Sequence, residues 1–320
     1  MPFDLVSTVD PYQFLQISRN PDGTITRLLQ HPSTTASPDL NSPSVILTKD
    51  VTLNPNHNTW LRIFLPRQAL DKKLPLIVYY HGGGFVLLSA STTPNHDFCS
   101  KLATRLSAVI VSVDYRLAPE HLLPAAYDDA VESLHWLKTT QEEWIREFVD
   151  YSNCYLMGTS AGGNIAYHAG LRASTTVDGF DPLKIKGLIL HHPFFGGTKR
   201  TGSELRMLND LYLPLSGSDL MWELALPAGV DRDHKYCNPM VDVRSDELEE
   251  ISRLGWRVLL TGCEGDPLIY RQRNLVELLR SRRIHVVAHF QDGFHGLELI
   301  DPTQDGPLLT YLKDFLYAYE

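Results

Sequence analysis

The 320-residue sequence is poor in cysteine, has no long hydrophobic run and is short of positive charge. Its four cysteines form no C-x-x-C pair, which argues against a zinc site or a redox dithiol. The clearest apolar run, residues 74–80, is far shorter than the roughly 20 residues that a membrane-spanning helix needs. Lysine and arginine total 29 against 38 aspartates and glutamates, a net charge of −9. This balance disfavours binding to nucleic acid or to an anionic membrane.

Targeting signals are also missing. The N-terminal stretch carries Asp4 and Asp10 where a signal peptide would carry an apolar segment. No asparagine begins an N-x-Ser/Thr site, and the C-terminus has no lipidation or retention motif. These absences predict a soluble, cytoplasmic protein with reduced cysteines, and neither nucleic acid nor a membrane as a partner.

Short apolar runs alternate with segments of helical periodicity along most of the chain. Strands are predicted at 58–66, 74–80, 108–113, 154–157, 185–191, 257–261 and 285–290. Helices are predicted after Pro124 through Leu137, after the 154–157 strand through Leu171, and at 216–226, 269–282 and 307–319. This alternation predicts an α/β fold with a mostly parallel central sheet and helices on both faces.

Two stretches depart from this alternation of strands and helices. Residues 1–50 have little periodicity and are predicted to form an irregular N-terminal arm. Residues 196–239 are too many for an ordinary loop, and we expect an insertion that lies over the sheet.

The strongest chemical signal is the G-x-S-x-G pentapeptide at residues 158–162. It follows a short apolar strand and opens a helix, as the turn that carries a nucleophilic serine requires. Its glycines suit a tight strand–turn–helix connection, which would expose the hydroxyl of Ser160. The alternative is a glycine-rich helix start at which the serine is only a cap.

A second glycine motif, His81-Gly82-Gly83-Gly84, directly follows a predicted strand. Its backbone N–H groups could stabilise a developing oxyanion. Alone, the motif could also be a flexible turn or a phosphate-binding loop. No Lys-Ser/Thr follows it, which disfavours the phosphate interpretation.

A serine nucleophile needs a base and an acid that orients this base. His295 follows the last predicted strand, and Asp266 follows the strand before it, in the chain order expected for this architecture. Glu264 and Asp292 are rival acids. His295 could instead be a solvated loop residue, and Asp266 could instead cap the helix that begins near Leu268.

The histidine pair His191-His192 ends another predicted strand. We expect one ring to face the core or a loop carbonyl and the other to face solvent. Without further ligands the pair is not a metal site.

Taken together, the motifs carry a family resemblance. They are His81–Gly84, Asp114–Glu120, Pro124–Asp128, Gly158–Asn164, Asp266–Leu268 and His295–Gly296, in this order. Across about residues 50–320 the chain resembles the hormone-sensitive-lipase-like α/β-hydrolases, and within them the plant carboxylesterases. Segments 199–205 and 231–239 are similar to one plant subgroup.

The resemblance implies a catalytic triad of Ser160 as nucleophile, His295 as base and Asp266 as its partner. It also implies an oxyanion hole made by backbone N–H groups, those of Gly83, Gly84 and Ala161, with His81 and Gly82 completing the first glycine motif. One α/β-hydrolase domain would span residues 1–320, with a cap formed by about 1–45 and part of 196–239. Residues 114–120 would be structural.

Two positions depart from the family pattern. Thr159 stands where an acid or a serine is more usual, which should tune the serine turn without changing the chemistry. Tyr270 stands where many relatives carry a second aspartate, so Asp266 is the acid of that loop in the right context.

We therefore expect a serine carboxylesterase that needs no cofactor or metal. It would act through an acyl-enzyme on small apolar esters, for example acylated secondary metabolites, as a monomer or weak homodimer. A hormone-type receptor on the same fold is an alternative, although those relatives lose the histidine that His295 matches. An alkaloid-type cyclase or lyase is another, although those relatives alter the His-Gly-Gly-Gly segment.

Overall fold

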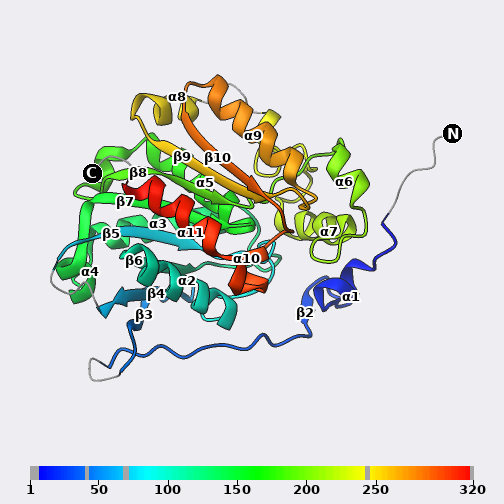
Figure 1. The fold of residues 1–320 in the computed structure, drawn as a ribbon. Coiled ribbons are helices and arrows are strands. Elements are labelled where there is room, and N and C mark those ends of the chain that lie inside the picture. The colour runs from blue at the N-terminus through cyan, green and yellow to red at the C-terminus, as the bar shows by residue number, and fades with distance from the viewer. Residues whose placement is uncertain (1–6, 40–42, 68–71, 242–245, 318–320) are drawn as a thin grey trace.

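The computed structural model describes residues 7–39, 43–67, 72–241 and 246–317. Its centre is an eight-stranded sheet with strand order β10-β9-β8-β7-β5-β6-β4-β3 (Figure 1). The strands are β3 Ile46–Asn54, β4 Thr59–Pro66, β5 Leu74–Tyr80, β6 Val109–Asp114, β7 Val149–Thr159, β8 Ile185–His191, β9 Arg257–Cys263 and β10 His285–Gln291. Strands β5 to β10 are parallel, and β3 and β4 are antiparallel to their neighbours.

Helices cover both faces of this sheet. They are α2 Thr93–Leu106, α3 Ala125–Thr139, α4 Glu143–Phe148, α5 Ala161–Ser174, α8 Asp246–Arg253, α9 Ile269–Ser281, α10 Leu297–Ile300 and α11 Gly306–Tyr317. Apolar residues of α2 and α11 pack on one face, in front of the sheet in Figure 1. Those of α3, α5, α8 and α9 pack on the other. The predicted architecture, a mostly parallel sheet between two helical layers, is confirmed.

The central strands owe their position to unbroken apolar runs. All seven residues of β5 are buried, and its alternate side chains contribute to the hydrophobic clusters on opposite faces of the sheet. A strand covered on both faces must be apolar at every position, because neither row of side chains meets water.

The structure reproduces the predicted strands and helices to within a few residues, except that β7 begins at Val149, five residues early. The predicted helix 307–319 corresponds to α11, and its last two residues lie outside the described part of the chain. Helices α2, α4 and α8 were not predicted. The first of these has its apolar residues Phe98, Leu102 and Leu106 at a spacing of four, a signal that could have been used.

The prediction that residues 1–50 are irregular holds for residues 28–39 but is wrong for other parts of this stretch. Their described part holds the helix α1 Pro11–Leu15, the strands β1 Ile17–Arg19 and β2 Ile25–Arg27, and the start of β3. The insertion 196–239 carries α6 Gly202–Arg206 and the expected helix, α7 Leu215–Ala225. Short 3-10 turns, η2 Val177–Phe180, η3 Pro239–Val241 and η4 Pro302–Gln304, complete the described elements.

The N-terminal segment is anchored to the rest of the molecule. Helix α1 packs against α7, beside which it lies in Figure 1. The Arg27 guanidinium donates two hydrogen bonds to Glu120 and one to each of the carbonyls of Val86 and Ala118, at 2.7–2.9 Å. These charge-assisted bonds fix the segment over one end of the sheet.

The four cysteines are all buried and free. Among the described residues, no helix combines the length and apolar character needed to cross a bilayer.

Residues 114–120, at the end of β6 and in the loop that follows it, make structural contacts. Asp114 accepts a hydrogen bond from the Ala90 N–H. The fully buried carboxylate of Asp129 accepts hydrogen bonds from the Arg116 guanidinium, the shortest 2.6 Å, and from the Arg116 backbone N–H at 2.8 Å. This pair ties the loop after β6 to α3.

Asp129→Ala should lower the free energy of unfolding by about 3 kcal/mol, because it strands a largely buried guanidinium. The matched control is Glu250→Ala, which removes the partner of Arg253 in an exposed ion pair and should change stability by less than about 1 kcal/mol. Urea unfolding of both variants measures the difference. Equal effects would contradict a stabilising role for the buried pair.

Candidate active site

The predicted site residues lie on loops at one edge of the sheet. His81 follows β5, Ser160 follows β7, Asp266 follows β9 and His295 follows β10. Because these strands are parallel, their carboxyl ends meet at the same edge. The sheet therefore gathers residues that are up to 214 positions apart in the sequence.

Ser160 occupies a strained turn between β7 and α5. Its backbone angles are φ 57° and ψ −117°, a conformation that L-residues rarely adopt. The turn is possible because both flanking glycines lack a side chain. A Cβ on Gly158 would lie 1.9 Å from the Gly162 carbonyl oxygen, and one on Gly162 would lie 1.8 Å from that of Tyr80.

Backbone hydrogen bonds hold the turn against the next strand. The Ser160 N–H donates to the His191 carbonyl at 2.9 Å, and the Phe194 N–H donates to the Ser160 carbonyl at 2.9 Å. Ser160 is a cap in position only, because its side chain makes no capping hydrogen bond. Its hydroxyl is free to face another group.

That group is His295. The Ser160 hydroxyl lies 2.9 Å from His295 Nε2, and His295 Nδ1 lies 2.8 Å from Asp266 Oδ2. A carboxylate only accepts, so Nδ1 carries the proton and Nε2 accepts the hydroxyl hydrogen. This is the tautomer that a general base needs.

Asp266 is fully buried and accepts four hydrogen bonds. Besides His295, its donors are Gln272 Nε2 at 2.8 Å, His192 Nδ1 at 3.1 Å and the Leu268 N–H at 2.8 Å. Burial by itself would raise the pKa of Asp266, but His295 and His192 hold this pKa well below its ordinary value. The Leu268 N–H belongs to the N-cap residue of α9, and no side chain caps this helix, so the alternative interpretation of Asp266 as a helix cap is wrong.

The rival acids lie elsewhere. Glu264 pairs with Arg273 at the surface, and Asp292 is exposed. Their loops nevertheless matter, because the Glu264 N–H donates to the Gln291 carbonyl and the Gly265 N–H to the Gly293 carbonyl. These bonds align the loop of Asp266 with the loop of His295.

The two positions that depart from the family pattern lie apart from this chain of hydrogen bonds. Thr159 is buried, and its hydroxyl oxygen accepts a hydrogen bond from the Tyr79 hydroxyl at 3.0 Å. Tyr270 is partly exposed on α9 beside Arg206.

The glycine loop after β5 lies beside Ser160. Gly83 and Gly84 have φ of 104° and 62°, which side chains disfavour. None of the N–H groups of Gly83, Gly84 and Ala161 donates a recorded hydrogen bond to another described residue. Ala161 begins α5, so its N–H is one of the unpaired donors of a helix start.

His81 braces this loop. Its ring is buried, stacks on Tyr115 with ring centroids 4.3 Å apart, and has Nδ1 2.7 Å from the Gly82 carbonyl. Burial lowers the pKa of His81, so the ring is neutral and Nδ1 donates this bond. The Tyr115 hydroxyl donates to the His81 carbonyl at 2.8 Å.

The expectation that one of His191 and His192 faces solvent is wrong, since both rings are buried. His191 Nε2 donates to Glu298 Oε2 at 3.0 Å, and the Thr261 hydroxyl lies 2.7 Å from His191 Nδ1. Sequence reasoning missed Glu298 entirely. Its only signal is its place three residues after His295, where an acidic side chain beside a reactive loop can be suspected.

Two sets of side chains here could in principle hold a metal ion. They are His191, His192 and Glu298, and His192, Asp266 and His295, with ligand atoms within 4.8 Å of one another. In both sets imidazole nitrogens face carboxylate oxygens directly at hydrogen-bond or ion-pair distance. Protons therefore satisfy these groups as they stand.

A cavity of about 370 Å³ opens above Ser160 and His295. Its walls are mostly apolar and come from the N-terminal segment, the glycine loop, the insertion and α10, including Phe14, Leu29, Leu87, Leu88, Leu213, Met221, Leu299 and Ile300. Tyr212 of the insertion also lines it and stacks on Phe294, with ring centroids 3.7 Å apart. A small number of polar groups in an apolar cleft is typical of a site for a small molecule.

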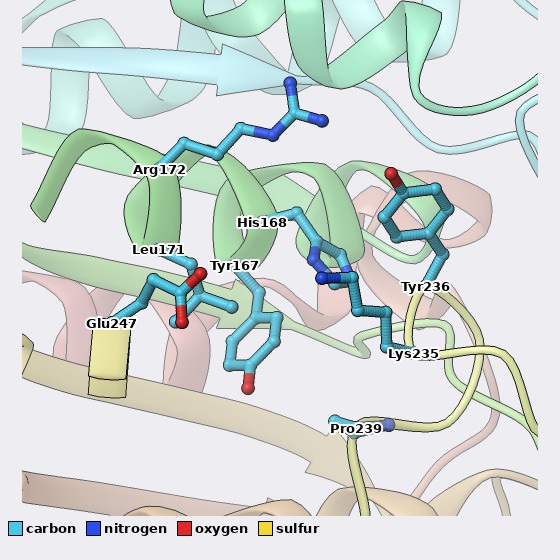
Figure 2. Close-up of a pocket in the computed structure, with 8 residues that line it drawn as sticks. All are labelled: Tyr167, His168, Leu171, Arg172, Lys235, Tyr236, Pro239 and Glu247. Carbon is cyan, nitrogen blue, oxygen red and sulfur yellow. The ribbon is translucent and has the colours of Figure 1, made fainter. Parts of the chain in front are cut away.

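A second, smaller cavity of about 90 Å³ lies between α5 and the chain around η3 and α8 (Figure 2). Figure 2 shows His168 projecting from α5 toward Lys235 and Tyr236. Burial lowers the pKa of His168 to about 3, so it stays neutral. The described residues that line this cavity include no serine or cysteine.

Comparisons with known proteins agree on one family. The model of a family described as alpha/beta hydrolase fold matches residues 77–299. Carboxylesterase 20 of Arabidopsis thaliana is 49% identical over 97% of each chain. A 3-O-acetylpapaveroxine carboxylesterase of Papaver somniferum is 47% identical over 96% of this chain and 99% of that one. The structure of a Pyrobaculum calidifontis esterase aligns with a TM-score of 0.72 and 28% identity, covering 85% of this chain and 84% of that one.

Gly162→Ala should destabilise the protein by about 3 kcal/mol, since the new Cβ would collide with the Tyr80 carbonyl oxygen, a backbone atom that cannot rotate away. Gly179→Ala is the control, because a Cβ there meets nothing within 4 Å. Melting temperature and soluble yield report the effect. Two variants of wild-type stability would contradict the close approach.

Proposed function

Because this chain belongs to the α/β-hydrolase family and is a carboxylic ester hydrolase, we propose that Ser160 carries its reaction through a covalent acyl-enzyme. The supporting observation is the continuous chain of hydrogen bonds from Ser160 through His295 to Asp266, at the floor of an apolar cavity.

In the first half-reaction His295 Nε2 takes the Ser160 proton while the oxygen attacks the ester carbonyl. The tetrahedral intermediate then collapses, and His295 passes the proton to the leaving alcohol. Asp266 stabilises the imidazolium that forms between these steps, which is why a carboxylate of lowered pKa suits this position.

In the second half-reaction water replaces the alcohol. His295 removes a proton from this water, the hydroxide adds to the acyl carbonyl, and collapse returns the proton to Ser160. The products are a carboxylic acid and an enzyme in its starting state, so no cofactor enters the balance.

The N–H groups of Gly83, Gly84 and Ala161 form the proposed oxyanion hole. Within the described part of the chain they donate to no other group, and such donors stabilise an oxyanion because they need no reorganisation when the charge appears. His81 and Gly82 hold the loop in place.

The substrate is a small apolar ester, and acylated secondary metabolites fit best. The cavity of about 370 Å³ admits a small molecule, and its lining residues in the described chain include no aspartate, glutamate, lysine or arginine. The relative from Papaver somniferum is named for an O-acetyl ester, which supports the same class.

The cap of this proposal consists of the N-terminal segment and part of the insertion 196–239 within one domain. Phe14, Leu15 and Gln16 from the first and Leu213 and Met221 from the second line the cavity. A monomer or weak homodimer in the cytoplasm remains a prediction.

Ser160→Ala should lower kcat on short p-nitrophenyl esters by roughly 10⁴-fold or more, since no nucleophile remains. The control is Ser112→Ala, a buried serine in β6 away from the site. Intact mass after an organophosphate should show one adduct in the wild type and in Ser112→Ala, and none in Ser160→Ala. Turnover or labelling that survives in Ser160→Ala would contradict the proposal.

Met221→Ala should shift preference toward longer acyl chains. Its side chain lines the cavity and fills the space beside Gly84, where a Cβ would lie 1.8 Å from the Met221 sulfur. Each methylene newly buried contributes about 0.8 kcal/mol, so the butyrate-to-acetate ratio of kcat/KM should rise about fourfold or more. Leu211→Ala, an exposed position of the same insertion, should leave the ratio unchanged. An unchanged ratio in Met221→Ala would count against this placement of the acyl group.

A further inference from the structure

His192 has a carboxylate at each of its two ring nitrogens. Nδ1 lies 3.1 Å from Asp266 Oδ2, and Nε2 lies 3.5 Å from Glu298 Oε2. A neutral imidazole has one N–H and one lone pair. In a neutral ring with its proton on Nδ1, the Nε2 lone pair would face Glu298, and the weak S–H donor of Cys263, 3.9 Å from Nε2, would offset little of the repulsion. The geometry therefore favours a ring protonated at both nitrogens.

The neighbouring His191 shows the contrasting case. Its Nε2 also reaches Glu298, but its Nδ1 faces the Thr261 hydroxyl, which can donate to it. One proton on the ring is enough, and burial lowers the pKa of His191. Of these two histidines, His192 is the one placed between two acids.

The charges around His192 also favour a protonated ring. Its neighbours are Asp266, Glu298, the Cys263 thiol 3.9 Å from Nε2, and the rings of His191 and His295 with centroids 4.3 and 5.4 Å away. Two buried carboxylates need a counterion, and no lysine or arginine among the described residues pairs with either. Burial opposes a charge on His192, but hydrogen bonds to Asp266, Cys263 and Glu298 raise its pKa well above the ordinary value.

The backbone also holds His192 in place. It has φ 46°, an unusual value for a residue with a side chain, and its N–H donates to the Thr261 carbonyl at 2.8 Å. The preceding carbonyl, that of His191, accepts the Ser160 N–H. One short segment is thus fixed to the Ser160 turn through its backbone and to Asp266 through the His192 ring.

We propose that His192 is a positioning residue of the active site: a buried imidazolium, shared between Asp266 and Glu298, that orients the Asp266 carboxylate and limits the negative charge that His295 meets. The proposal rests on the function proposed above, in which His295 is the base. With the cation present, two acids and one imidazolium leave one net negative charge beside His295. Without it, two negative charges favour the protonated form of His295, which cannot act as a base.

The test uses His192→Asn, which keeps a donor toward Asp266, tolerates the positive φ and removes the charge. The acidic limb of kcat/KM against pH should move up by about one pH unit, because a cation 5.4 Å from the His295 ring is lost. KM should stay constant and kcat at neutral pH should fall roughly tenfold. His192→Gly, which removes the donor as well, should lower kcat further.

The double variant His192→Asn/Glu298→Gln removes one negative charge together with the positive one. Its acidic limb should return toward that of the wild type. A merely structural role would lower kcat in every variant without moving the limb, and that outcome would overturn the proposal. Equal kcat values in His192→Asn and His192→Gly would also overturn the proposal.

A measurement on the unaltered protein covers the case in which a variant does not fold. In ¹⁵N-histidine-labelled wild type at about pH 9, one imidazole should remain protonated at both nitrogens, whereas exposed histidines are neutral there. A spectrum with no doubly protonated imidazole at this pH would overturn the proposal. Organophosphate labelling of Ser160 in the same sample separates the two proposals, because a labelled serine with an unshifted acidic limb defeats this inference alone.

Discussion

The carboxylate of Asp266 is the constraint on which the site depends. It is fully buried, and a buried charge is tolerated only when donors surround it. Its donors come from β9–α9, from the loop after β8 and from the loop after β10. All of these hydrogen bonds to the Asp266 carboxylate form only when the three loops keep fixed positions relative to one another. These positions orient His295 toward Ser160.

The sheet supplies the frame for this arrangement. Parallel strands place their carboxyl ends at one edge, so each loop begins from a fixed point. The turn at Ser160 adds a second constraint, because its strained φ and ψ persist only while Gly158 and Gly162 allow the helix to approach the strand. Packing of the sheet holds the turn in this strained conformation, and the conformation places the Ser160 hydroxyl at the floor of the cavity.

Above this rigid edge the cavity is assembled from parts distant in sequence. Helix α1 packs on α7, and Tyr212 stacks on Phe294 next to His295. Most of these walls are apolar side chains, which shape the space without adding charge. The chemistry is therefore tied to the strand ends, while the selection of substrates is left to the N-terminal segment and the insertion.

Local patterns in the sequence were enough to predict the apolar strands β4 to β10, the glycine-bounded serine turn and the order of the loops, because these depend on neighbouring residues. Helix α2 was missed although its apolar residues recur at a spacing of four, and strand β3 was missed because its polar residues mask the pattern that packing against β4 completes. The sequence could name Asp266, Glu264 and Asp292 as acids but could not choose by geometry, and it assigned one ring of His191-His192 to solvent. The structure decided both questions through burial, because Asp266 and both histidine rings are buried whereas Glu264 and Asp292 are exposed. The distances between Asp266, His192 and Glu298 follow from how β8, β9 and α10 meet, and contacts between segments so far apart in the chain leave no local pattern.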